Sequence, residues 1–135
     1  MMTEKWTRWE PIQGLSEKYY IDSVMDTVDG FTIFLSDAKD EEKKVKVFFK
    51  DSVDVYRSAN ESFRYQLIVE LKEKYGSDFY GDWTFFKVEN SSYVQWLLEQ
   101  SAGIADGIMF THFSFIASDS VLDILDPVEP KVELI

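Results

Sequence analysis

The sequence of 135 residues contains no cysteine and no long hydrophobic run. Without cysteine the chain forms no disulfide, and it has neither a thiol nucleophile nor a zinc site built on thiolates. Residues 1–11 have no apolar core behind their basic residues, so they do not resemble a signal peptide. No window approaches the roughly 18 apolar residues that a membrane span requires. We therefore expect a cytoplasmic protein with no membrane partner.

Basic residues are scarce. The chain has 14 Lys and Arg against 25 Asp and Glu, a formal net charge of −11. Such a charge repels phosphate backbones, so a nucleic-acid partner is disfavoured and a basic protein partner is favoured. The shortage is local: residues 1–75 hold 12 bases and 15 acids, whereas residues 76–135 hold 10 acids but only Lys87 and Lys131 as bases. The charge pattern predicts that a basic partner binds the C-terminal part of the chain.

Histidine is represented once, by His112. Any Ser-His-Asp arrangement or imidazole metal site must therefore use this residue. His112 lies in the middle of an apolar run, where a single histidine is usually a hydrogen-bonded core residue. The chain also lacks the P-loop, the G-x-G-x-x-G fingerprint, the G-x-S-x-G elbow and the H-E-x-x-H motif. We expect no catalytic residue, no cofactor and no bound metal.

Alternating apolar and polar residues in the first third of the chain predict three antiparallel strands. Asp29-Gly30 is expected to form the tight turn of a β-hairpin between the first two of them. The predicted strands cover residues 19–28, 31–35 and 43–49.

Helix signals follow. Ser58-Ala-Asn-Glu61 has the spacing of a capping box, and apolar residues then repeat at helical spacing as far as Gly76, which predicts a helix over residues 59–75. Asn90-Ser-Ser92 provides side-chain oxygens that cap a second helix, which Gly103 ends. The remaining predicted elements are a strand over 83–88, a central strand covered on both sides over 108–117, a strand or helical turn over 121–125, and an edge strand over 131–135.

Together these elements predict an α+β fold, because strands are grouped first and helices come later. We expect one antiparallel sheet of about five to six strands, in the order β-β-β-α-β-α-β with a possible extra C-terminal strand, and two helices packed on it. Residues 1–135 form a single globular domain, in which residues 1–15 are an N-terminal arm that docks on the sheet.

The candidate partner-binding residues come from the acidic C-terminal part, where carboxylates alternate with aromatic side chains. Aromatic residues supply buried contact area in an interface, and charges steer the approach of the partner. The candidates are Asp78, Asp82, Trp83, Glu99, Asp106, Asp119 and Asp123. The competing interpretation is that the aromatic residues are core and the acids only keep the domain soluble.

Four segments, Val55–Ser62, Trp83–Leu97, His112–Leu125 and Glu129–Val132, resemble parts of small, largely uncharacterised cytoplasmic proteins of Bacillus-type bacteria. The resemblance extends over roughly residues 45–133. Those proteins tend to be encoded in loci of secreted polymorphic toxins, where small acidic proteins serve as immunity factors. The positions that recur among them are matched here by Tyr56, Arg57, Glu61, Asn90, Ser91, Trp96 and His112.

The resemblance implies a single-domain immunity-type protein, without enzymatic activity, that binds and neutralises a basic cognate toxin domain such as a nuclease. Two alternatives remain open at this point. One is a carboxylate-based or metal-assisted hydrolase that uses Asp78 with Asp82, or Asp119 with Asp123. The other is a non-enzymatic scaffold or self-associating domain whose contacts are made by Trp6 and Trp9 in the N-terminal arm.

Overall fold

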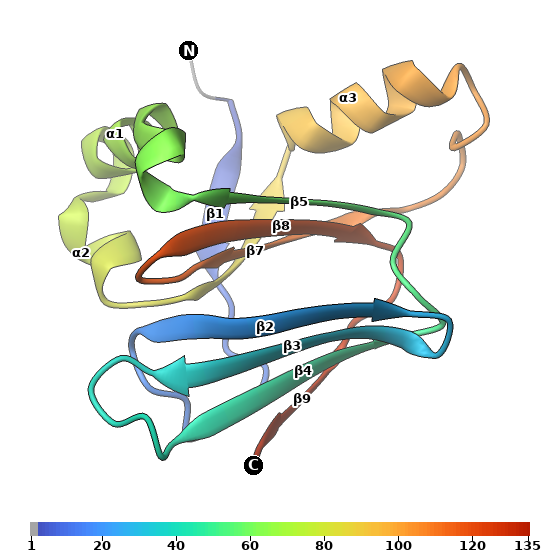
Figure 1. The fold of residues 1–135 in the computed structure, drawn as a ribbon. Coiled ribbons are helices and arrows are strands. Elements are labelled where there is room, and N and C mark those ends of the chain that lie inside the picture. Colours follow the sequence, from blue (N-terminus) through green and yellow to red (C-terminus); the bar gives the residue numbers. More distant parts are fainter. Residues whose placement is uncertain (1–2) are drawn as a thin grey trace.

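The computed structural model describes residues 3–135, which form two antiparallel β-sheets packed face to face with helices on the outer face of one sheet (Figure 1). The strands are β1 (Lys5–Arg8), β2 (Tyr19–Thr27), β3 (Gly30–Asp37), β4 (Lys44–Lys50), β5 (Val55–Asn60), β6 (Phe85–Glu89), β7 (Thr111–Ile116), β8 (Ser120–Asp126) and β9 (Lys131–Leu134). The helices are α1 (Tyr65–Tyr75), α2 (Ser77–Gly81) and α3 (Ser92–Ser101), and a 3₁₀ turn, η1 (Glu61–Arg64), precedes α1.

The strand order is β1-β6-β7-β8-β5 in the five-stranded sheet and β2-β3-β4-β9 in the four-stranded sheet. The chain crosses between the sheets in residues 9–18, 51–54 and 127–130. The predicted α+β class is confirmed, but the prediction of one sheet was wrong. Alternating strands have the same pattern whether their apolar faces meet helices or a second sheet, so the sequence did not reveal that the sheet divides.

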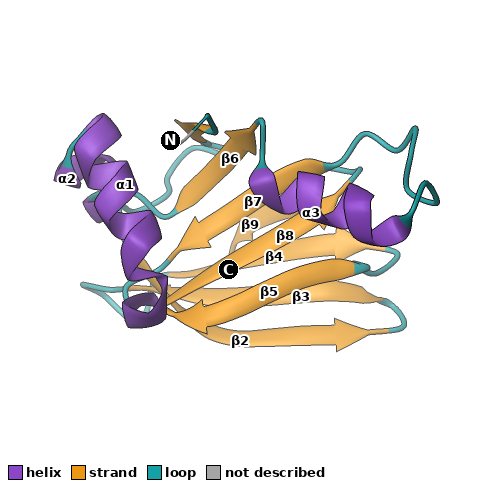
Figure 2. Cartoon of the chain, turned by 90° about the horizontal axis from the view of Figure 1, so that it is seen from above, coloured by secondary structure: helices purple, strands orange, loops and turns teal. Residues whose placement is uncertain are grey.

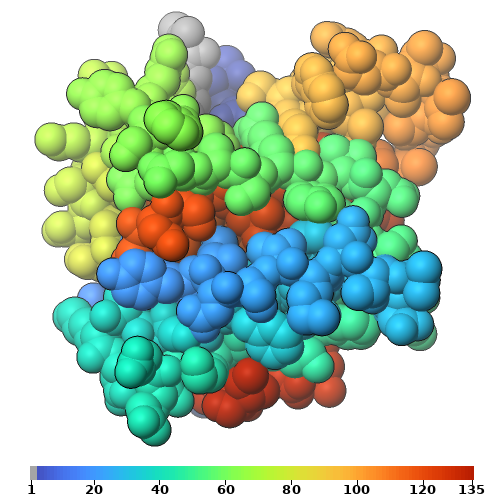
Figure 3. All heavy atoms as spheres, viewed as in Figure 1, coloured from blue at the N-terminus to red at the C-terminus, as the bar shows by residue number. Residues whose placement is uncertain are grey.

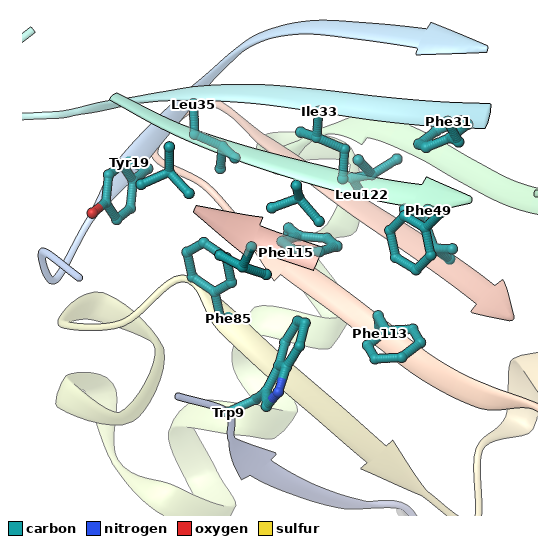
Figure 4. Close-up of a cluster of buried hydrophobic side chains, with 14 of the residues drawn as sticks. Trp9, Tyr19, Phe31, Ile33, Leu35, Phe49, Phe85, Phe113, Phe115 and Leu122 are labelled. Carbon is teal, nitrogen blue, oxygen red and sulfur yellow. The ribbon is translucent and has the colours of Figure 1, made fainter. Parts of the chain in front are cut away.

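The core lies between the two sheets, where side chains from both inner faces interlock (Figure 4). Ile33 of β3 and Val47 of β4 are register partners, and both point inward with no exposed surface. Phe113 and Phe115 of β7 face them from the other sheet. Phe115 contacts Trp9 and Phe85 edge-on, and Phe113 contacts Trp9 with the two rings tilted. Burial of each such side chain stabilises the fold by about 2–3 kcal/mol.

The predicted hairpin is present as β2 and β3, with its turn one residue earlier than expected. Val28 and Asp29 form the loop, and Gly30 is already the first residue of β3. Gly30 has a φ of 144°, and a Cβ there would lie 2.6 Å from the carbonyl oxygen of Phe49. Glycine is required at this position because no side chain fits against β4.

The capping box at Ser58 is absent, which corrects the predicted helix over residues 59–75. Residues 55–60 form β5, which pairs with β8, and the cap lies two residues later, where the Asn60 side chain accepts from the Ser62 amide. The helix α1 then begins only at Tyr65. Pairing along six residues of β8 outweighed the local helix-start signal, because tertiary contacts override a weak propensity.

The N-terminal arm contributes a strand of its own. β1 pairs with the edge strand β6, and both Trp6 and Trp9 are buried. Trp9 belongs to the core between the sheets, whereas Trp6 packs under the helices. Docking of the arm is therefore confirmed, and these two rings are not available as contacts for a second molecule.

Two helical regions cover the outer face of the five-stranded sheet and leave a gap between them, as the view from above shows (Figure 2). α1 and α2 lie over one end, where Leu67 and Leu71 pack on Phe86 and Ile116. α3 lies over the other end, capped by Ser91 as the sequence predicts. In the described residues no helix combines the length and apolar character needed to cross a bilayer.

Candidate functional site

The outer face of the five-stranded sheet carries polar side chains in the gap between α1 and α3. The strand register places Arg57, Asp123 and Ser114 side by side in one row across β5, β8 and β7. His112 lies two residues from Ser114 on the same face of β7. This part of the sheet therefore brings together polar groups from three strands, of which Arg57 and Asp123 are charged.

Asp123 is the centre of the cluster. Its side chain has no exposed surface, and its oxygen Oδ2 accepts hydrogen bonds from Arg57 Nε at 2.9 Å and from Arg64 Nη1 at 2.7 Å. The other oxygen, Oδ1, lies 2.7 Å from His112 Nε2. The carboxylate is thus fully paired by partners from β5, η1 and β7, as a buried charge must be.

Burial alone would raise the pKa of Asp123. The hydrogen bond from His112 and the nearby charges of Arg57 and Arg64 outweigh that effect and hold the pKa of this carboxyl well below its usual range. Asp123 is therefore ionised at every pH at which the protein is normally handled.

His112 connects this ion pair to the start of α3. Because the ionised Asp123 only accepts, His112 Nε2 donates to its Oδ1, and His112 Nδ1 shares a hydrogen bond of 2.7 Å with Ser91 Oγ. Ser91 Oγ in turn accepts from the Val94 amide and caps α3. The interpretation of His112 as a hydrogen-bonded core residue agrees with this geometry.

Ser91, His112 and Asp123 are hydrogen-bonded in the order of a Ser-His-Asp triad, with His112 in the middle. Three features favour a structural role. All three side chains are buried, Asp123 is shared with two arginines, and Ser91 Oγ is engaged as the helix cap. The chain of contacts ties α3, the sheet and η1 together.

Aromatic side chains continue the cluster along α3. The guanidinium of Arg57 lies over the Tyr93 ring, 4.0 Å from its centroid, and Tyr93 stacks with Trp96 at 5.7 Å between centroids. Burial raises the pKa of the Tyr93 hydroxyl. Trp96 is 49% exposed, so the contacts from Asp123 through Arg57 and Tyr93 to Trp96 lead from the buried carboxylate to the surface.

A second buried cation, Lys18, lies at the other end of the five-stranded sheet. Its ammonium donates to the backbone carbonyls of Tyr80, Trp83 and Ile116, which uses all three of its hydrogens. Burial lowers the pKa of Lys18 to about 8. Because every hydrogen is paired within the fold, we assign Lys18 a structural role in holding α2 and β6 against β7.

The seven candidate partner-binding residues do not share one face. Asp123 is wrong as a surface candidate, because it is buried in the ion-pair cluster. Trp83 is half-buried and donates its indole hydrogen to the Trp9 carbonyl. Asp78 and Asp82 are exposed at α2, and Asp119 is exposed in the turn between β7 and β8.

The remaining two candidates, Glu99 and Asp106, belong to a separate corner of the molecule formed by α3 and the loop 102–110. Figures 1 and 3 show this segment projecting beside the gap over the sheet. Its exposed apolar residues were missed by sequence reasoning, because a buried continuation of the strand was expected over 108–117. We call the α3 surface the set Trp96, Glu99, Ile104, Asp106, Ile108 and Met109.

The hydrolase alternatives depend on carboxylates that converge. Asp78 and Asp82 lie one helical turn apart. Asp119 is exposed in the turn before β8, whereas Asp123 is buried in β8, four residues or about 13 Å further along the extended chain. Within residues 3–135 no group of three or more His, Asp or Glu side chains is arranged to hold a metal ion.

The chain was also compared with known proteins. It matches no family model, and neither the curated proteins nor the solved structures include a significant match. Fold and site together define an α+β two-sheet protein with a buried ion-pair cluster and a projecting apolar and acidic corner.

Proposed function

We propose that this protein is an acidic immunity-type protein that binds and neutralises a basic cognate toxin domain through the α3 surface. The observation that carries this proposal is the exposure of large apolar side chains in a segment that contains acids but no base. Ile104 is 88% exposed and Met109 is 85% exposed, next to the 49% exposed Trp96. Exposed apolar groups concentrated in one segment are typical of a protein contact surface.

The charges of the same segment support a basic partner. Between Lys87 and Lys131 the chain contains neither lysine nor arginine. Glu99 lies one helical turn after Trp96, and Asp106 lies between Ile104 and Met109 in the loop. A partner with complementary positive charge would be steered to these carboxylates and would cover the apolar side chains between them.

The test is calorimetric titration of the full chain with the toxin domain encoded in the same locus. We expect the double variant Trp96→Ala/Met109→Ser to bind at least tenfold more weakly, since buried anchors dominate interface energies. Wild-type affinity should also fall as salt is raised from about 50 mM to about 300 mM, because long-range steering is screened.

The matched control is Met25→Ser/Val28→Ser in the β2–β3 hairpin, where both side chains are also exposed. This variant loses similar apolar surface elsewhere and should bind like the wild type. Failure of the wild type to bind would overturn the neutralisation proposal, and equal losses in the two double variants would overturn the choice of surface. Melting curves show whether either variant has lost its fold.

A further inference from the structure

Two guanidinium groups share one carboxylate oxygen in the gap between α1 and α3. Arg57 Nε and Arg64 Nη1 both donate to Asp123 Oδ2, so two positive charges are held against one negative charge. The two arginines come from the consecutive elements β5 and η1, and both reach Asp123 of β8. The buried carboxylate fixes both guanidinium groups and leaves an excess of positive charge in an otherwise acidic molecule.

Most of the hydrogen-bonding capacity of these arginines is unused. Among the described residues, Arg57 donates only through Nε and Arg64 only through Nη1, although each guanidinium has five hydrogens. The Arg57 side chain is 43% exposed and the Arg64 side chain is 20% exposed. The unused hydrogens therefore belong to side chains that are partly exposed to solvent.

A third arginine on the same sheet provides a contrast. Arg8, at the opposite edge, donates Nε to the Phe79 carbonyl and Nη2 to the Asp78 carbonyl. Both of its hydrogen bonds go to backbone carbonyls, and it serves to hold α2. The arrangement around Asp123 is thus a specific feature of the gap and not a general property of arginines on this sheet.

An aromatic wall adjoins the arginine pair. The Tyr93 ring lies against the Arg57 guanidinium, and the exposed Trp96 stacks with Tyr93 at 5.7 Å between centroids. A guanidinium binds two oxygens of a carboxylate or phosphate group through parallel hydrogen bonds, and an exposed indole packs against planar apolar groups. The Arg57 guanidinium and the Trp96 indole both contact Tyr93, so the two kinds of group lie close together.

We propose that Arg57 and Arg64 form an oxyanion-binding site in the gap between α1 and α3. The site takes the carboxylate or phosphate group of a ligand, and Trp96 packs against a planar apolar part of that ligand. The site shares Trp96 with the α3 surface, but its two arginines lie outside that surface, so the proposal does not rest on the proposed basic partner.

The test follows the Arg57 Nε–H and the Trp96 indole N–H by nitrogen-15 NMR in the full chain. Acetate, inorganic phosphate and benzoate are titrated separately, with sodium chloride balancing the ionic strength. We expect the Arg57 signal to shift saturably with acetate, with phosphate or with both, and benzoate to bind at least threefold more tightly than acetate. The acetate and phosphate titrations distinguish the two oxyanion classes.

Variants separate the two parts of the site. Arg64→Lys keeps the charge but loses the planar fork, so it should weaken acetate and phosphate binding at least threefold, whereas the matched control Arg8→Lys should leave it unchanged. Trp96→Ala should remove the preference for benzoate and leave acetate binding intact. Amide spectra confirm that each variant is folded.

The wild-type titration alone is decisive, so the result does not depend on how well a variant folds. Absence of a saturable Arg57 shift with both acetate and phosphate overturns the site, as does an equal response at the Arg8 Nε–H. Equal affinity for benzoate and acetate overturns the role of Trp96. None of these outcomes depends on whether the basic partner binds the α3 surface.

Discussion

The two faces of the five-stranded sheet differ in what they bury. The inner face presents apolar side chains such as Phe113, Phe115 and Ile124 to the other sheet. The outer face of the same strands buries Ser114, His112 and Asp123 between apolar patches. Neighbouring residues of one strand thus have different roles, because successive side chains point to opposite faces of the sheet.

The difference indicates how tasks are divided in this molecule. The apolar face supplies most of the stabilisation by removing hydrocarbon from water, without requiring particular partners. The polar face contributes less net stability but demands specific geometry, since a buried charge is tolerated only with its partners in place. It fixes where η1 and α3 lie, and it positions two arginines at the surface.

The largest expected loss of stability comes from a substitution on the apolar inner face. Phe115→Ala should lower the free energy of unfolding by about 4 kcal/mol, because a fully buried ring is replaced by a cavity against Phe85 and Trp9. Urea unfolding followed by tryptophan fluorescence measures the change. Phe63→Ala, at an exposed ring, is the control and should change stability by less than about 0.5 kcal/mol. A loss below about 1 kcal/mol in Phe115→Ala would contradict the assignment of this face as the main core.

The second largest expected loss of stability comes from a substitution on the polar outer face. Asp123→Asn should cost about 3 kcal/mol at neutral pH, because Arg57 and Arg64 lose their common carboxylate partner. The measurement is the same urea unfolding, and Asp119→Asn in the exposed turn is the matched control. If the two Asp→Asn changes cost the same, the cluster does not stabilise the fold.

The stabilisation that the ionised Asp123 gives to the fold should be lost at acid pH. Its pKa in the folded state lies below the unfolded value of about 3.9, so the stabilisation is complete above that value and is lost as pH falls through lower values. The difference in unfolding free energy between wild type and Asp123→Asn should therefore shrink by up to about 1.4 kcal/mol per pH unit below pH ~4. A difference that stays constant from pH 6 to pH 2 contradicts the depressed pKa.

The alternation of apolar residues was enough to predict the apolar face. Phe31, Ile33 and Leu35 in β3 and Val45 and Val47 in β4 alternate with outward residues, and the predicted strands occur where expected. The division into two sheets was not predicted. It depends on the crossing at Asp51 and Ser52, which both have positive φ, and nothing in the residue types marks that conformation.

The polar face was predicted only in part. His112 was recognised as a hydrogen-bonded core residue and Ser91 as part of a helix cap. Their common partner Asp123 was assigned to the surface, because carboxylates are usually solvated and Arg57 and Arg64 are 66 and 59 residues away along the chain. Such pairs are set by tertiary structure, which local patterns do not encode.

A smaller loss of stability is expected when the contact between the ion-pair cluster and α3 is removed at Ser91. Ser91→Ala removes both the cap of α3 and the hydroxyl that binds His112, and it should cost about 1–2 kcal/mol. Ser92→Ala, in the first turn but exposed, is the matched control and should cost less. Urea unfolding compares the two variants, and a larger loss in Ser92→Ala would contradict the role of Ser91.

The smallest expected effect concerns Ser114, which lies beside Asp123 in the row. Its hydroxyl is buried and has no hydrogen-bond partner among the described residues. Ser114→Ala should therefore be neutral or stabilising by up to about 1 kcal/mol, because it removes an unpaired buried polar group. Thermal unfolding measures this, with Ser118→Ala in the nearby turn as control. A clear destabilisation would mean that the hydroxyl is paired in solution.

The central functional claim is that a basic partner covers α3 and the loop 102–110. Hydrogen–deuterium exchange in the presence of the proposed toxin domain tests it most directly, because it locates the contact without any substitution. We predict that amides of residues 92–110 exchange more slowly in the complex, while those of the β2–β3 hairpin are unchanged. Protection of the hairpin with no change in residues 92–110 would contradict the claim.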